Sequence, residues 1–178
     1  MSTGQLITNL QIRLLEARQI PIIAEAFTAL GWDKPASQYE RYLAEQEAGA
    51  RPVLVAYLDG AFAGYVTVKW RSHYPAFADA NIPEIADFNV LPQFRRRGIG
   101  TRLMDEAERL IAERSAVAGI GVGMIADYGA AQRLYVLRGY VPDGAGVTYF
   151  DKVVQYLDPI AADHDLVLYF TKLLAVSS

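Results

Sequence analysis

A basic turn between a strand-like and a helix-like segment constrains the fold of this chain more than any other feature. Residues 90–101 read VLPQFRRRGIGT. The first amides of a helix lack intrahelical partners and carry part of the helix dipole, so an anion is favoured there. Gly98 and Gly100 let phosphate oxygens approach the main chain, which predicts a phosphate-binding helix start, with a solvated basic turn as the alternative. Positive charge comes from three arginines, any of which can meet the ligand: Arg95, Arg96 and Arg97.

The two common nucleotide-binding motifs do not explain this turn. The sequence Gly-x-x-x-x-Gly-Lys-Ser/Thr does not occur in the chain. The segment Gly119–Gly123 lacks the Gly-x-Gly-x-x-Gly spacing and begins a predicted strand rather than a helix. The sequence therefore indicates neither a P-loop nor a Rossmann dinucleotide site.

Apolar periodicity predicts alternating strands and helices around the turn. Asp59-Gly60, between two alternating segments, is typical of a tight β-hairpin. The expected strands are 11–15, 53–57, 63–68, 85–90, 120–126, 147–150 and 166–170. The expected helices are 21–30, 37–47, 99–114 and 130–138. The β-α-β-α order of the middle part indicates a mixed α/β architecture.

Composition limits the class of protein further. The 178 residues are 52% hydrophobic, which suits one compact domain spanning 1–178. The chain has no cysteine and two histidines, so we expect no disulfide and no metal site. A net charge of -3 argues against a nucleic-acid partner. No segment approaches the roughly 18 consecutive apolar residues of a membrane span, so we expect no membrane partner and a cytoplasmic location.

A second motif follows the basic turn along the chain. Residues 131–140 read AQRLYVLRGY. This segment and Arg95-x-x-Gly98-x-Gly100 together resemble the two signatures of the GNAT superfamily of acyltransferases. Two motifs in the expected order and spacing coincide by chance far less often than either one alone. The motif-level similarity covers residues 84–140.

The resemblance implies an α/β (α+β) GNAT fold in a bacterial-type, single-domain N-acetyltransferase. Such a fold has a central mixed, mostly antiparallel sheet of roughly six to seven strands, flanked by about four helices and splayed between strands 4 and 5. The implied cosubstrate is acetyl-CoA, and the implied reaction is direct transfer of its acetyl group to an amine, without a metal.

The resemblance also implies which residues bind the cofactor. The pantetheine arm is expected to pair with main-chain groups of Phe88, Asn89 and Val90. Tyr128 stands where many members of the family carry asparagine, which puts that contact in doubt. The remaining expected contacts are Arg95, Arg96, Arg97, Gly98, Ile99, Gly100, Thr101, Ala131 and Tyr135.

Three residues are candidates for proton transfer. Tyr135 matches the tyrosine that the family uses to protonate the leaving thiolate, with core packing as the alternative. Glu84 stands at the offset where the histone acetyltransferase branch carries its general base, and Asp87 is a second candidate. Apolar neighbours favour a raised pKa for these carboxylates. A water chain is the alternative to both.

The acceptor is not fixed by the sequence. We expect a primary amine of a small molecule, with a protein lysine or N-terminus as the first alternative. A non-catalytic acyl-CoA-binding module is the second alternative, and a homodimer is plausible. Candidate acceptor-site aromatics, which serve equally well as strand and rim residues, are Trp32, Tyr39, Tyr42, Trp70, His73, Tyr74, Tyr149, Tyr156 and His164. Candidate acids for a cationic acceptor are Asp127, Asp143, Asp151 and Asp158.

Overall fold

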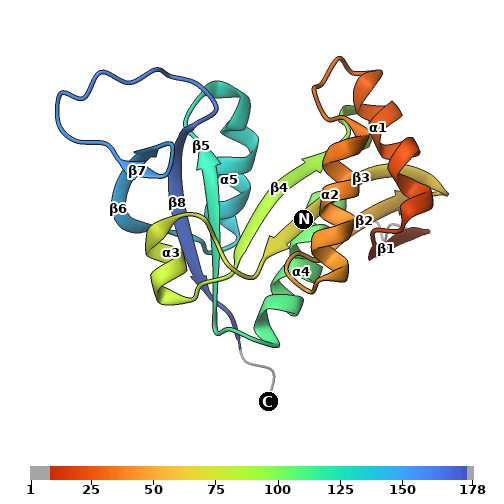
Figure 1. The fold of residues 1–178 in the computed structure, drawn as a ribbon, viewed down its shortest axis with the longest axis horizontal. Coiled ribbons are helices and arrows are strands. Elements are labelled where there is room, and N and C mark those ends of the chain that lie inside the picture. Colours follow the sequence, from red (N-terminus) through yellow and green to blue (C-terminus); the bar gives the residue numbers. More distant parts are fainter. Residues whose placement is uncertain (1–8, 176–178) are drawn as a thin grey trace, which may run out of the picture. The chain divides into compact units, whose positions relative to one another are not determined.

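The structure, a computed structural model, describes residues 9–175 as helices of two kinds and a mixed sheet (Figure 1). The strands are β1 (Leu10–Leu14), β2 (Val53–Leu58), β3 (Ala61–Lys69), β4 (Glu84–Val90), β5 (Val117–Gly123), β6 (Val141–Tyr149), β7 (Lys152–Val153) and β8 (Leu166–Leu173). The α-helices are α1 (Ile20–Thr28), α2 (Ala36–Glu47), α3 (Pro75–Ala80), α4 (Ile99–Ala112) and α5 (Gly129–Leu137). Single 3-10 turns are η1 (Ala17–Gln19), η2 (Pro92–Phe94) and η3 (Ala126–Tyr128).

The sheet confirms the expected mixed α/β class. Its strand order is β1-β2-β3-β4-β5-β8-β6-β7, with a parallel β4–β5 pair. The described residues form eight strands and five α-helices, one strand and one helix more than the largest numbers expected. The additional elements are β7, which has two residues, and α3, which has six; both are too short to give a periodic pattern.

The chain forms two compact units, and β4 contributes to both of them. Among the described residues, the first unit consists of 9–68 and 87–109, and the second consists of 69–86 and 110–175.

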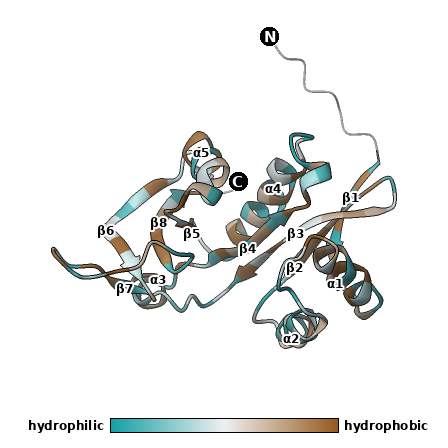
Figure 2. Ribbon diagram, turned by 90° about the horizontal axis from the view of Figure 1, so that it is seen from above, coloured by the Kyte–Doolittle hydropathy of each residue, from teal (hydrophilic) through white to brown (hydrophobic). Residues whose placement is uncertain are grey.

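The first unit is built on the antiparallel strands β1, β2 and β3. Asp59 and Gly60 both have positive φ angles, 52° and 80°, as a type I′ hairpin turn requires. Figure 2 shows α1 and α2 on one face of these strands and α4 on the other. The first helix buries Ile23 and Phe27 completely, and burial of each side chain stabilises the fold by about 2 kcal/mol.

Helix α4 is anchored by one apolar stripe. Ile99, Leu103, Ala107 and Ile111 recur at four-residue spacing, and each has at most 1% of its surface exposed. The charged residues on the rest of the helix are partly or fully exposed. The start of α4 is therefore held in a fixed place against the strands of the first unit.

The second unit is built on β5 and β8, which pair antiparallel from Val117↔Leu173 to Gly123↔Val167. The parallel register of β4 with β5 covers Glu84↔Gly119 and Ile85↔Ile120. Figure 2 shows α3 and α5 on opposite faces of β5 and β8. Phe77 of α3 packs on Gly119 so closely that a Cβ there would lie 2.3 Å from its ring.

Strand β5 begins and ends three residues earlier than the periodicity predicts. The strand stops at Gly123, where a Cβ would lie 2.4 Å from the Tyr128 ring, and the chain then turns into η3. The expected boundary was wrong because this contact, rather than the apolar run, ends the strand. None of the helices within residues 9–175 combines the length and apolar character of a membrane span.

Candidate functional site

The predicted phosphate-binding turn belongs to the first unit and leads directly into α4. Arg96 and Gly98 have left-handed backbone conformations, with φ angles of 58° and 77°. The four residues 95–98 are exposed, and Arg102 N–H donates to the Gly98 carbonyl at 3.1 Å as the first turn of α4 forms. Main-chain amides at a helix start attract an anion, so this geometry suits a phosphate group.

The three arginines of the turn differ in what they contact. Arg95 Nε donates to the Val90 carbonyl at 3.1 Å and ties the turn to the end of β4. The Arg97 guanidinium lies over the Phe94 ring, 5.7 Å from its centroid. Arg96 is exposed at a positive φ angle, which for arginine is uncommon. All three arginines thus add positive charge at the start of α4, but their side chains are restrained by different contacts.

Gly100 is required by the close approach of β4. A Cβ at Gly100 would lie 3.1 Å from Phe88 Cζ and 3.7 Å from Val90 Cγ2. On the same strand, the Asn89 carbonyl would lie 2.4 Å from a Cβ at Gly64 of β3. The predicted residues Phe88, Asn89, Val90, Ile99 and Gly100 are therefore brought together within the first unit. Thr101 is exposed on the first turn of α4.

Some main-chain groups at the end of β4 already form hydrogen bonds within the protein. The Val90 carbonyl accepts the Arg95 hydrogen bond, and Leu91 N–H donates to the Ala63 carbonyl of β3 at 2.9 Å. Val90 is predicted to pair with a pantetheine arm, but its carbonyl already accepts a hydrogen bond from Arg95. The glycines, the helix start and the basic turn still fit a diphosphate.

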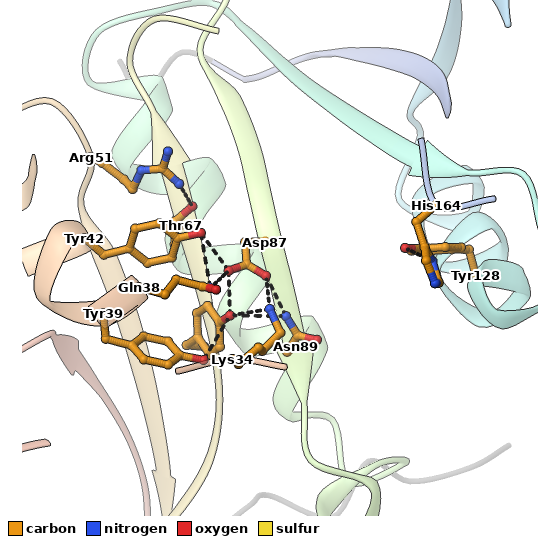
Figure 3. A network of polar contacts seen from close by, with 11 residues as sticks. Lys34, Gln38, Tyr39, Tyr42, Arg51, Thr67, Asp87, Asn89, Tyr128 and His164 are labelled. Atoms are coloured by element: carbon orange, nitrogen blue, oxygen red, sulfur yellow. Dashed lines mark hydrogen bonds and ion pairs between the residues drawn. The ribbon is translucent and has the colours of Figure 1, made fainter. Parts of the chain in front are cut away.

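Asp87 is surrounded by hydrogen-bond donors from both helices and strands of the first unit (Figure 3). Oδ1 accepts from Lys34 Nζ at 2.7 Å and from Asn89 Nδ2 at 2.9 Å. Oδ2 accepts from three donors: Gln38 Nε2 at 2.9 Å, Tyr42 OH at 2.9 Å and Tyr65 OH at 2.6 Å. This set of residues, Lys34, Gln38, Tyr42, Tyr65, Asp87 and Asn89, is called the Asp87 network below.

The network corrects the expectation of a raised pKa at Asp87. Burial raises the pKa of this carboxyl, but the Lys34 charge and the hydrogen bonds from Lys34, Tyr65 and Tyr42 outweigh burial and lower it. Burial and the Asp87 charge raise the pKa of Tyr42 to about 12 and that of Tyr65 well above its ordinary value. Asp87 therefore stays ionised and both tyrosines stay protonated at neutral pH, which disfavours Asp87 as the general base.

Glu84 has a simpler environment in the second unit. Its side chain is buried, Ser72 Oγ donates to Oε2 at 2.7 Å, and Lys69 Nζ lies 3.7 Å from the same oxygen. Ser72 also accepts the Tyr74 N–H at 3.0 Å, which fixes its hydroxyl. One strong donor leaves Glu84 with more acceptor capacity than Asp87 has.

Tyr135 lies on α5 in the second unit and is 5% exposed. Burial, and secondarily the nearby Tyr128, raise its pKa, so its hydroxyl is protonated at neutral pH. Its ring centroid lies 6.1 Å from that of Tyr140. Ala131 precedes it by one helical turn and is half-buried. A protonated, buried hydroxyl is suited to donating a hydrogen bond to an anion.

Tyr128, which replaces the asparagine of many family members, packs its ring in the space beside Gly123. Its hydroxyl lies 3.0 Å from His164 Nδ1 (Figure 3). The replacement thus links η3 to the loop before β8. Within the described residues, no cluster of three or more His, Asp and Glu side chains is arranged to hold a metal.

Several of the expected acceptor-site aromatics belong to the core instead. Tyr39 and Tyr42 are 0% and 6% exposed, and Tyr74 is buried and stacks on Tyr169 with centroids 3.8 Å apart. The Tyr74 and Tyr169 hydroxyls donate to Asp143 and Asp151 at 2.8 and 2.6 Å, so two of the expected acids hold the core.

Other candidates are partly or fully exposed. Tyr149 is half-buried and donates to Asp163 at 2.9 Å, and Tyr156 is 93% exposed. His73, Asp127 and Asp158 are also exposed.

Sequence reasoning missed Lys34, Gln38 and Tyr65. Lys34 follows α1, Gln38 lies on α2 and Tyr65 lies on β3, and they meet only around Asp87. A signal was available for Tyr65 alone, since the hydroxyl of a tyrosine in a buried strand usually has a hydrogen-bond partner.

Comparison with known proteins agrees with this arrangement. Residues 19–140 match the family model described as the acetyltransferase (GNAT) family. An uncharacterised N-acetyltransferase of Archaeoglobus fulgidus is 38% identical over 72 residues, which are 40% of this chain and 48% of that protein. The match thus spans about half the length of this curated relative.

Two solved structures share the fold over nearly their whole length. The ribosomal-protein-alanine N-acetyltransferase of Brucella melitensis superimposes with a TM-score of 0.67 at 20% identity, covering 92% of this chain and 99% of that one. The PaiA N-acetyltransferase of Thermoplasma acidophilum, solved in complex with coenzyme A, gives a TM-score of 0.63 at 13% identity, covering 91% and 98%. The fold and the matched residues define an acyltransferase of the GNAT type. The chain belongs to the GNAT acetyltransferase family.

Proposed function

We propose that the protein transfers the acetyl group of acetyl-CoA to a primary amine of a small molecule. The observation that carries this proposal is the exposed turn 95–98, which enters α4 through left-handed residues at Arg96 and Gly98. The turn combines exposed arginines, a glycine next to the helix start and an anchored helix. These are the properties that a diphosphate needs from a protein.

The cosubstrate fits the first unit at two further places. At the helix start, Gly100 lies against the Phe88 ring, and the absence of a side chain leaves its main chain open to a ligand. The end of β4 supplies the remaining main-chain groups for the pantetheine arm. The coenzyme A complex of the PaiA relative supports the same cosubstrate class for this chain.

The proposed chemistry requires two proton transfers. The amine nitrogen attacks the thioester carbonyl, the C–N bond forms, the C–S bond breaks and the sulfur leaves as a thiolate. A lysine-like amine has a pKa of about 10.4, so removing its proton at neutral pH costs about 4 kcal/mol. Glu84, directly or through water, takes this proton in the proposal. The Tyr135 hydroxyl, which is protonated at neutral pH, donates its proton to the leaving thiolate and regains one from the nitrogen as the amide forms.

The proposed acceptor is a small cation because residues 143–165 carry an excess of negative charge. Between Asp143 and Asp165 the sequence has five aspartates and one lysine. Asp158 and Asp165 are exposed, and their negative charge attracts a protonated amine from solvent. The name of the Brucella relative supports a second candidate, a protein N-terminus as acceptor.

Release of free thiol from acetyl-CoA in the presence of an amine panel tests the proposal. The panel contains polyamines, aminoglycoside-type amines, a lysine peptide and an alanine-terminated peptide. Turnover with small amines is expected, whereas turnover with peptides alone would assign the second acceptor class. If no acceptor of the panel gives thiol release, although coenzyme A binds measurably, the protein would be a non-catalytic acyl-CoA-binding module.

A glycine substitution tests whether the turn binds the cofactor. Gly98→Val places a β-branched residue at a φ angle of 77° and is expected to weaken acetyl-CoA binding at least about tenfold in calorimetry. Gly49→Val is the matched control, because Gly49 has a φ angle of 73° at the end of α2 and nothing within 4 Å of its Cβ position. Equal affinity in both variants would remove the turn from the site.

Three further predictions concern the whole protein. We propose that residues 1–178 act as a single N-acetyltransferase domain, that the protein is cytoplasmic and that two copies associate. Light scattering at several concentrations measures the association. A constant mass equal to that of one chain would remove the dimer from the proposal.

A further inference from the structure

We propose that Asp87 is a positioning residue whose network of donors fixes its own left-handed backbone conformation inside β4 and thereby the main chain of residues 88–90. The inference rests on the proposed function for its role, because these residues are the expected partners of the pantetheine arm. The network itself is a property of the first unit alone. It gives Asp87 a task different from the proton transfer expected of it.

Asp87 interrupts an otherwise regular strand. Its φ angle is 45°, in the left-handed region that a residue with a Cβ enters only at a cost. The other six residues of β4 are absent from the set of positive φ angles in the described chain. Aspartate tolerates this conformation better than most residues, but the surrounding structure has to hold it.

The carboxylate provides that restraint by joining separate elements. Lys34 comes from the segment between α1 and α2, Gln38 and Tyr42 from α2, Tyr65 from β3 and Asn89 from β4 itself. These five donors occupy both oxygens of Asp87. A carboxylate with this many donors has a fixed orientation.

Tyrosine packing holds the donors in place. Tyr65 is fully buried, and the Tyr39 hydroxyl donates to that of Tyr65 at 3.4 Å. The Lys34 ammonium lies 5.6 Å and 5.7 Å from the ring centroids of Tyr65 and Phe27. The Lys34 and Asp87 side chains are 18% and 19% exposed, so their ion pair is little screened by solvent.

The restraint continues into the residues that follow Asp87. Asn89 donates back to Asp87 from two residues further along β4, and the Asn89 carbonyl lies against Gly64. Leu91 N–H bonds the Ala63 carbonyl, which ends the segment. Residues 88–90 are therefore held at both ends, with the Asp87 network at the first end.

Other roles for Asp87 fit less well. A general base needs free acceptor capacity, and both oxygens are already occupied. A binding site for a cationic acceptor needs an unpaired anion, and Lys34 already neutralises this one. The contacts of Asp87 therefore fit a residue that holds the main chain of residues 88–90 in place.

Hydrogen exchange of the protein without ligand tests the inference independently of catalysis. In Asp87→Asn and Lys34→Met, the exchange rates of the amides of residues 88–90 are expected to increase about tenfold more than those of the amides of β5, which report any change in the global stability. Tyr65→Phe removes one donor and is expected to give a smaller increase in the same amides. Tyr57→Phe is the matched control, because the buried Tyr57 hydroxyl has no hydrogen-bond partner among the described residues.

Calorimetry with coenzyme A gives the functional result. Asp87→Asn and Lys34→Met are expected to weaken binding about tenfold, with Tyr57→Phe unchanged. Unchanged exchange at residues 88–90, or a uniform increase across the whole unit, would overturn the positioning role. Failure of the wild-type protein to bind coenzyme A would instead refute the proposed function, while the exchange result would still decide the inference. If Asp87→Asn does not fold, Tyr65→Phe carries the same comparison.

Discussion

Glu84 and Asp87 lie three residues apart on β4, but the two units surround them differently. Asp87, in the first unit, is bound by five donors and has a positive φ angle. Glu84, in the second unit, is bound by Ser72 at 2.7 Å and has Lys69 at 3.7 Å. A carboxylate saturated with donors holds structure, whereas one with fewer donors keeps lone pairs for chemistry. The chemical identity of a side chain is thus a poor guide to its task.

The largest expected difference concerns the two lysines. Lys34→Met leaves a mostly buried carboxylate without its counter-ion, and we expect the free energy of unfolding to fall by about 3 kcal/mol. Lys69→Met removes a longer contact and leaves the Ser72 hydrogen bond intact, so we expect a loss of about 1 kcal/mol. Urea unfolding of both variants measures the difference. Equal losses would show that the two carboxylates depend on their cations to the same extent.

The next prediction assigns proton transfer to Glu84. Glu84→Gln keeps the shape of the side chain and is expected to lower the maximal rate about 100-fold, with unfolding changed little. The rate is measured by thiol release with the best amine of the panel. A full rate in Glu84→Gln would assign the proton to a water chain that bypasses this carboxylate.

A smaller effect is expected at Tyr135. Tyr135→Phe is expected to lower the maximal rate about tenfold and to leave acetyl-CoA affinity unchanged, because the hydroxyl acts on the leaving thiolate. Tyr140→Phe is the control for loss of a buried hydroxyl, because the buried Tyr140 ring lies 6.1 Å from that of Tyr135. Equal rates in wild type and Tyr135→Phe would assign Tyr135 to core packing alone.

The smallest expected effect is the dependence of stability on acid. The pKa of Asp87 is lower in the folded protein than in the unfolded chain, so its contribution is complete above about pH 4 and declines as the pH falls through the folded pKa. The charged or titratable groups that face it are Lys34, Tyr42 and Tyr65, and none of them changes charge in this range. Unfolding of wild type and Asp87→Asn is therefore expected to converge below this pH. A difference in unfolding free energy between the two proteins that stays constant down to pH 2 would contradict this prediction.

Local patterns account for the parts of the fold that were predicted correctly. The hairpin at Asp59 and Gly60, the first two helices and the start of α4 depend on residues close together in the chain. Helix α3 was missed because its six residues are too few to give a periodic pattern, and the end of β5 was missed because it depends on the contact of Tyr128 with Gly123. The basic turn was visible in the sequence because its glycines, arginines and helix start are consecutive.

The sequence by itself determined the family, the basic turn and the order of most strands and helices, since each of these depends on nearest neighbours in the chain. Only the tertiary structure decided that Asp87 is held by a lysine 53 positions away and by tyrosines 45 and 22 positions away. Hydrogen bonds and ion pairs act over a few ångström in space, and folding alone brings such distant side chains within that range.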